Sequence, residues 1–221
     1  MEPNAIQNIG EELIKVLEAK NHARELALTN SRATIRHCAH SIRAAHRGEM
    51  ETAAELIGAA GEIVAASRAA LLDSHPDIYW AGYVQDAQKE YTEACVVSAI
   101  IGKKGIPRAV ELGVEPAAYL NGLGEAAGEM RRYVLDIIRH GNTPASRCEE
   151  VLMVMEDIYS LLVTVDFPDA ITDGLRRTTD MVRGVLERTR GDVTFALQQR
   201  QLTQALGIRD QGLGVGDQEG E

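Results

Sequence analysis

Aromatic residues are scarce in this chain of 221 residues, at 4%, whereas apolar residues make up 45%. The core is therefore expected to be aliphatic, which favours closely packed helices. There are only three cysteines, Cys38, Cys95 and Cys148, and they are too far apart to form a CxxC motif. We expect them to be reduced, buried thiols in a cytoplasmic protein.

Long uncharged apolar runs are also missing. No stretch approaches the roughly 18 residues of a membrane-spanning helix, and residues 1–13 show no basic segment followed by an apolar core. We therefore expect no secretory signal and no membrane partner. The motifs GxxxxGK(S/T), GxSxG and HExxH are absent, so phosphate-loop, serine-hydrolase and zinc-protease chemistry lack their local signatures. The missing ExxH motif argues against a helical-bundle metal oxidase.

Basic residues are fewer than acidic ones, 23 against 33, and the formal net charge is −10. Such a balance argues at first sight against nucleic acid as a partner. However, residues 20–47 carry six lysines and arginines against a single acid, Glu25. Residues 48–93 carry nine acids and only two basic residues. Because the charge is so unevenly distributed, the net value excludes no class of partner.

Apolar residues recur at helical spacing through most of the chain, and glycine, proline and capping residues mark the breaks. The first predicted helix starts at Pro3 and runs to Gly48, as one helix or two abutting ones. The others cover residues 49–74, 77–102 with a weak point at Gly82, 115–139, 143–165 and 172–206. The sequence thus predicts an all-α fold of about six or seven antiparallel helices, packed as a bundle or superhelix. A single domain should span residues 1–206, followed by a disordered, acidic tail at 207–221.

Two pairs of glutamates are the most informative candidates for chemistry. Glu90 and Glu93 lie three residues apart, and Glu125 and Glu129 lie four apart, so each pair occupies one helical face. Small residues around the second pair would let another helix approach closely: Gly122, Gly124, Ala126, Ala127 and Gly128. Facing carboxylates repel unless a cation lies between them, and oxygen ligands favour Mg²⁺, Mn²⁺ or Ca²⁺ over zinc. The alternative is that these glutamates are solvated surface residues.

A basic stripe is predicted from five residues at intervals of 4, 4, 3 and 4: Arg32, Arg36, His40, Arg43 and Arg47. These intervals place the side chains along one side of a helix, where they would follow a phosphate backbone. The alternative is a solvated face, or an ion-pairing partner for the acidic second helix. The stripe by itself does not decide between these interpretations.

The segments QKEYTEACV and AAYLNGLGEAAGEMRRYVLDIIRHGN resemble the translin family, and within it the Trax (translin-associated factor X) type of subunit. The segment DFPDAITDGLRRTTDMVRGVLERTRGD is similar to archaeal members. The resemblance implies the all-α translin fold and a closed, barrel-like homo-oligomer that encloses RNA or single-stranded DNA. It also implies catalysis, because Trax subunits are metal-dependent endoribonucleases.

The acids of Trax that carry catalysis fall on Glu90, Glu93 and Glu125, with Glu129 as the neighbouring acid of the second motif. Plain translin subunits lack this full set. Animal Trax has Asp where this chain has Glu125, which moves the carboxylate by about one carbon–carbon bond. The resemblance thus implies that Mg²⁺ or Mn²⁺, held by these four glutamates, activates water to cut single-stranded RNA, leaving a 5′-phosphate and a 3′-hydroxyl.

The basic stripe would then position the RNA backbone, with little sequence preference, through Arg32, Arg36, Arg43 and Arg47. Arg131 and Arg132 are further candidates to face the substrate. The alternative function is a non-catalytic, oligomeric RNA or single-stranded DNA binding protein of translin type. Metal dependence separates the two functions, because arginine binds phosphate without an ion.

Overall fold

The computed structural model describes residues 5–141 and 144–207, and every regular element within them is a helix. The six long helices of these ranges are α1 (Ala5–His46), α2 (Met50–Leu71), α4 (Gly82–Ile101), α6 (Pro116–His140), α7 (Ala145–Thr164) and α9 (Leu175–Ala205). The same ranges contain three helices of four residues: α3 (Pro76–Tyr79), α5 (Ala109–Leu112) and α8 (Asp169–Thr172). The predicted all-α fold class is confirmed. Of the predicted tail, 207–221, only Gly207 is among the described residues.

The first helix, α1, is uninterrupted over 42 residues. It ends where Gly48 adopts a φ of 80°, a left-handed conformation that favours glycine. Gly141, with a φ of 67°, ends α6 in the same way, and Pro116 occupies the first position of that helix. These ends agree closely with the predicted ones because glycine and proline act locally on the backbone.

Two predicted helices have different starting points in the structure. The segment 77–102 is divided because Ala81 is extended (φ −67°, ψ 143°), which separates α3 from α4. The last helix begins at Leu175 rather than at 172 or 173, since Asp173 and Gly174 are both left-handed, with φ values of 51° and 74°. The first break lies beside Gly82, where the sequence indicated a weak point, whereas the second was not predicted.

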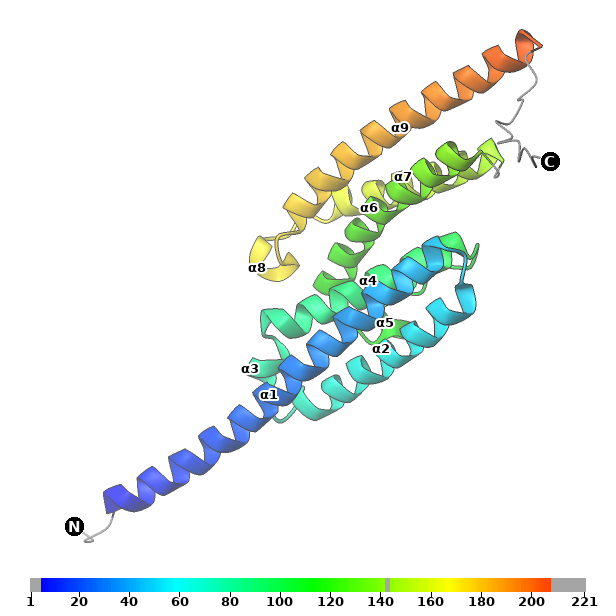
Figure 1. The fold of residues 1–221 in the computed structure, drawn as a ribbon. Coiled ribbons are helices and arrows are strands. Elements are labelled where there is room, and N and C mark those ends of the chain that lie inside the picture. The colour runs from blue at the N-terminus through cyan, green and yellow to red at the C-terminus, as the bar shows by residue number, and fades with distance from the viewer. Residues whose placement is uncertain (1–4, 142–143, 208–221) are drawn as a thin grey trace, which may run out of the picture.

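The long helices form two groups in the part of the chain that is described (Figure 1). In one group, α1 and α2 form an antiparallel hairpin against which α4 packs, and in the other α6, α7 and α9 pack on one another. The contact between α4 and α6 joins the two groups. The segment 102–115 returns the chain to the start of α4, where Gln88 accepts a hydrogen bond of 2.8 Å from the backbone of Glu115. As a result, the side of α4 that carries Glu90 and Glu93 faces α6 at Glu125.

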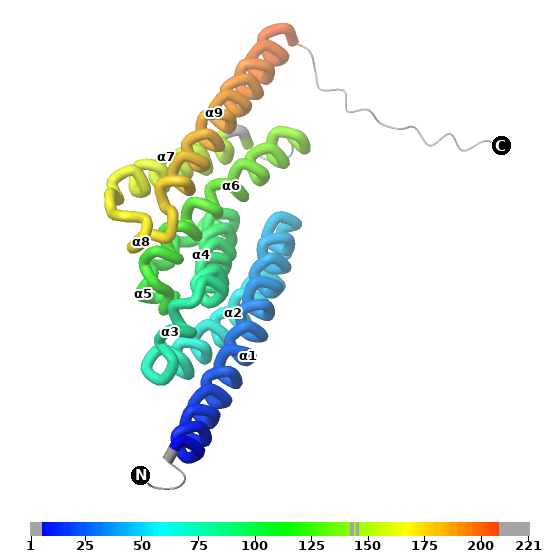
Figure 2. The backbone as a smooth tube through the Cα atoms, turned by 90° about the vertical axis from the view of Figure 1, so that its left-hand side faces the viewer, coloured from blue at the N-terminus to red at the C-terminus, as the bar shows by residue number. Residues whose placement is uncertain are grey.

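One hydrophobic cluster runs through all six long helices of the described ranges, and it is aliphatic, as the composition predicts. It includes the free thiols of Cys38, Cys95 and Cys148, and their predicted burial is confirmed. Figure 2 shows that the first half of α1 and the last turns of α9 extend beyond the packed helices at opposite ends. Within residues 5–141 and 144–207, no helix combines the length and apolar character that crossing a bilayer requires.

Candidate metal centre

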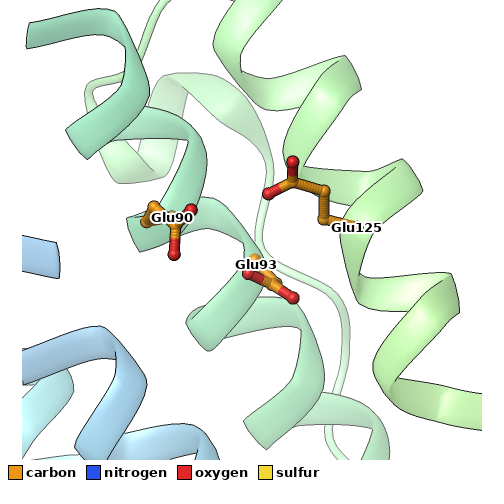
Figure 3. A group of neighbouring side chains, drawn as sticks. All are labelled: Glu90, Glu93 and Glu125. Atoms are coloured by element: carbon orange, nitrogen blue, oxygen red, sulfur yellow. The ribbon is translucent and has the colours of Figure 1, made fainter. Parts of the chain in front are cut away.

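Three of the four predicted glutamates converge where α4 and α6 face each other. Glu90 and Glu93 extend from one side of α4, and Glu125 extends toward them from α6 (Figure 3). One carboxylate oxygen from each residue lies within 4.8 Å of one oxygen from each of the other two. We call these three residues the acid cluster. They offer the oxygen donors that a hard divalent cation binds.

Gly122 permits the close approach of α6 to α4. A Cβ atom at this position would lie 2.6 Å from the Lys89 carbonyl oxygen and 2.7 Å from the Cβ of Thr92, so a larger residue would push the helices apart. Gly124 has the same effect against α9, where a Cβ would overlap a threonine side chain. The predicted packing role is therefore confirmed for Gly122 and Gly124, whereas a Cβ at Gly128 would meet open space.

Glu93 is the most buried acid of the cluster, with 9% of its surface exposed. Burial, reinforced by the charges of Glu90, Glu125 and Glu129, raises the pKa of Glu93 from an ordinary 4.5 to about 8. The pKa of Glu90 is also raised, first by burial and then by the charge of Glu125. The metal-free cluster therefore retains a proton at neutral pH, and a divalent cation fits here because it would replace that proton with greater positive charge.

Glu129 lies outside the acid cluster and has a partner of its own. Its Oε2 accepts a hydrogen bond of 2.7 Å from Nε2 of His46, at the end of α1. This hydrogen bond is the main reason that the pKa of Glu129 is lowered. The His46 side chain is only 4% exposed, and its Nδ1 has no hydrogen-bond partner among the described residues. Because 83 residues separate His46 from Glu129, sequence spacing did not single out this histidine.

Lys89 is the second residue near the cluster that the sequence did not reveal. Its ammonium nitrogen lies 2.9 Å from Glu125 Oε1 and 3.7 Å from Asp86 Oδ1. Lys89 precedes Glu90 in the chain and so points from a neighbouring side of α4. Only the approach of α6 brings Glu125 within reach, and no local pattern contained that information.

The predicted basic stripe lies on the surface of α1, where all four of its arginines are exposed: Arg32, Arg36, Arg43 and Arg47. Arg47 pairs with Glu49 at 2.6 Å. The stripe lies beside the contact between His46 and Glu129, because His46 follows Arg43 by three residues on the same helix. The other arginines of the stripe lie on the solvent-exposed side of α1, away from its buried face.

The two arginines that follow Glu129 on α6 have different surroundings. Arg131 pairs with Asp192 at 2.8 Å and donates a hydrogen bond of 3.3 Å to Thr189, which fixes α6 to α9. Arg132 is more exposed and lies 3.7 Å from Glu129. Of this pair, Arg132 is therefore the one that is free to turn toward a substrate.

No family model matches the chain. A protein of Methanocaldococcus jannaschii, described as uncharacterized, is 31% identical over 196 residues, which are 88% of this chain and 85% of that protein. The crystal structure of AfC3PO, an archaeal protein of translin/Trax type, is 36% identical, covers 86% of this chain and 98% of its own, and gives a TM-score of 0.78. The structure of AfC3PO in complex with duplex RNA is 36% identical, covers 86% of this chain and 97% of its own, and gives a TM-score of 0.76. The crystal structure of apo-NeC3PO shares the fold: it is 23% identical, covers 89% of this chain and 98% of its own, and gives a TM-score of 0.70. This chain therefore belongs to the translin family, as an archaeal Trax-like member.

Proposed function

We propose that this protein is an endoribonuclease that uses a divalent metal ion to hydrolyse RNA phosphodiesters. The observation that carries the proposal is the convergence of Glu90, Glu93 and Glu125 from two helices, with Glu93 buried among like charges. Such an arrangement costs folding free energy in a purely structural role, and it is typical of functional sites. The expected ion is Mg²⁺ or Mn²⁺, because the donors are all carboxylates.

When bound, the ion would activate water and stabilise negative charge on the phosphate oxygens. The residues of the chain prepare the site for it. Glu93 would hold the ion as an ionised carboxylate, its proton having passed to solvent, and Gly122 keeps Glu125 within reach of α4. His46 fixes the carboxylate of Glu129 one turn beyond Glu125, where we propose that it completes or orients the ligand set.

RNA as the substrate is supported by the relative AfC3PO, which has been solved with duplex RNA. Family resemblance leads us to propose single-stranded RNA as the strand that is cut. The exposed arginines of α1 (Arg32, Arg36, Arg43 and Arg47) would bind the phosphates of the RNA. Because such contacts do not read bases, we expect slight sequence preference, and single-stranded DNA would bind as well.

We propose that several copies assemble into a closed shell around the RNA. Large apolar side chains are 55% to 86% exposed along the first turns of α1, at Ile6, Ile9, Leu13, Val16 and Leu17. The last turns of α9 lie at the opposite end of the described chain (Figure 2). Two of their apolar side chains, Phe195 and Leu202, are 64% and 53% exposed. Exposed apolar stripes of this length are typical of protein–protein contacts. A cytoplasmic location is part of the proposal and rests on the three free thiols.

A non-catalytic nucleic-acid binding protein is the second candidate, and one observation favours it. Glu125 and Glu129 already have partners within the chain, Lys89 and His46, so the contact between helices is satisfied without a metal ion. In that case the arginines of α1 would hold RNA or single-stranded DNA while the acids served assembly. The two candidates differ in whether RNA is cut and whether cutting needs metal.

The experiment is cleavage of end-labelled RNA, single-stranded and duplex, in Mn²⁺, Mg²⁺ or EDTA. We expect cutting by the wild type with either metal and none in EDTA. Glu125→Gln should lower the rate by about 100-fold or more, since it removes one charged group at the reacting centre. RNA binding should persist in that variant. Glu55→Gln, an exposed acid on α2, is the matched control and should cut like the wild type.

The outcomes separate the candidate functions. Binding of RNA without cutting, by wild type and variant in both metals, would replace the nuclease with the binding protein. Cutting that survives EDTA and Glu125→Gln would show that the activity does not belong to this site.

A further inference from the structure

Lys89 occupies a place in the acid cluster that the proposed nuclease reaction leaves unexplained. Its ammonium nitrogen lies 2.9 Å from Glu125 Oε1, and its side chain is 23% exposed. Within residues 5–141 and 144–207, it is the single cationic side chain that forms an ion pair with Glu90, Glu93 or Glu125. The cluster thus contains one positive charge of its own.

A divalent ion at the same carboxylates would bring two like charges close to this ammonium. The repulsion is large at such short distances in a half-buried site, and the metal outcompetes a single charge for the carboxylates. Lysine is suited to leaving, because its charge is compact and its four-carbon stem is flexible. The Lys89 side chain is partly exposed, so it can leave Glu125 by turning toward solvent.

We propose that Lys89 is a resident counter-ion of the acid cluster, that a divalent metal displaces it from Glu125, and that the freed ammonium then binds a phosphate of the RNA. The inference rests on the proposed metal-dependent function. It assigns Lys89 two partners in sequence: Glu125 when the metal is absent, and the nucleic-acid backbone when the metal is present.

Two measurable consequences follow from this exchange. Removing the charge of Lys89 removes the competitor, so the cluster binds metal more tightly. It also removes one phosphate contact, but only when metal is bound. Because coupling between two ligands is reciprocal, metal and RNA should each strengthen the binding of the other in the wild type, and less so without the lysine.

The experiment compares the wild type with Lys89→Gln and Lys89→Arg. Lys103→Gln is the matched control, because Lys103 pairs with an acid (Glu150, 3.6 Å) at the far end of α4. Titration calorimetry with Mn²⁺ alone should show about tenfold tighter binding for Lys89→Gln. Lys89→Arg keeps the charge and should stay within about threefold of the wild type, as should Lys103→Gln.

RNA binding is then measured by fluorescence anisotropy with a 2′-O-methyl RNA oligonucleotide, checked on a gel to remain intact. The slope of log affinity against log salt counts phosphate contacts. Without Mn²⁺, the slopes of wild type and Lys89→Gln should agree. With Mn²⁺, the slope of the wild type should be steeper than that of Lys89→Gln by about one contact.

Unchanged Mn²⁺ affinity in Lys89→Gln, or a slope difference that is the same with and without Mn²⁺, would overturn the inference. If the wild type cuts RNA with Mn²⁺ while Lys89→Gln matches Lys103→Gln in both assays, only the role of Lys89 fails. If the wild type binds no Mn²⁺, the proposed function fails together with the inference.

Discussion

Replacing Glu93 by glutamine tests how the acid cluster is charged when no metal is bound. Glutamine keeps the size of the side chain but cannot ionise. In the wild type, burial and the neighbouring acids raise the pKa of Glu93 from 4.5 to about 8. Between these two values the folded protein holds a proton that the unfolded chain has released. The free energy of unfolding therefore falls as the pH rises through this window.

The pKa gives the size of the effect. The window from 4.5 to about 8 spans about 3.5 pH units, and each unit changes the free energy of unfolding by about 1.4 kcal/mol. The metal-free wild type should thus lose up to about 5 kcal/mol across the window, a large part of the stability of an ordinary domain. Glu93→Gln lacks this contribution. Glu90, whose pKa is also raised, adds a slope of the same sign to both proteins.

The assay is urea unfolding of both proteins in EDTA, from pH 5 to pH 8.5, at one fixed protein concentration. We expect the stability of the variant relative to the wild type to increase steadily toward pH 8. Mn²⁺ should stabilise the wild type most at high pH, where no proton competes for the carboxylates. Parallel stability curves for the two proteins in EDTA would refute the reasoning, because Glu93 would then ionise as an ordinary surface acid.

Three further changes have defined outcomes. Gly122→Ala should destabilise the protein by about 1–3 kcal/mol through overpacking. Gly128 faces open space, so Gly128→Ala should stabilise the protein by about 0.5–1 kcal/mol. Equal effects of the two substitutions in chemical denaturation would contradict the proposed helix contact. Replacing Arg36 and Arg43 together by glutamine should reduce the salt slope of RNA binding by about two, and an unchanged slope would remove the arginines from the interface. Glu115→Ala should lower the free energy of unfolding by about 2–4 kcal/mol in thermal or urea unfolding. It removes the acceptor of two hydrogen bonds, donated by Arg68 at 2.7 Å and by Tyr79 at 2.6 Å. A loss below about 0.5 kcal/mol would show that these hydrogen bonds do not stabilise the fold.

The helices could be predicted because they depend on local features of the chain. Apolar spacing, together with the glycines at positions 48 and 141, located most of the long helices and their ends. The break at Ala81 lies beside Gly82, the expected weak point, but a full break was not predicted because alanine strongly favours the helix. The left-handed Asp173 was also missed, although aspartate followed by glycine is a local signal for a turn.

The candidate site was partly predictable. Spacing of three and four residues places Glu90 with Glu93, and Glu125 with Glu129, on single helical faces, whatever the tertiary structure is. Family resemblance supplied the expectation that these faces meet. It did not supply Lys89, because the relevant partner of that lysine lies on another helix.

The sequence by itself thus determined the helices, their apolar faces, the two glutamate pairs and the arginine stripe of α1, since each depends on residues within a few turns of one another. The tertiary structure decided which acids converge. Gly122 lets α6 approach α4 and brings Glu125 to Glu93. Glu129 is instead bound by His46 of α1, which lies 83 residues earlier in the chain. Burial at that contact also raises the pKa of Glu93, because only a packed interior removes water from a carboxylate.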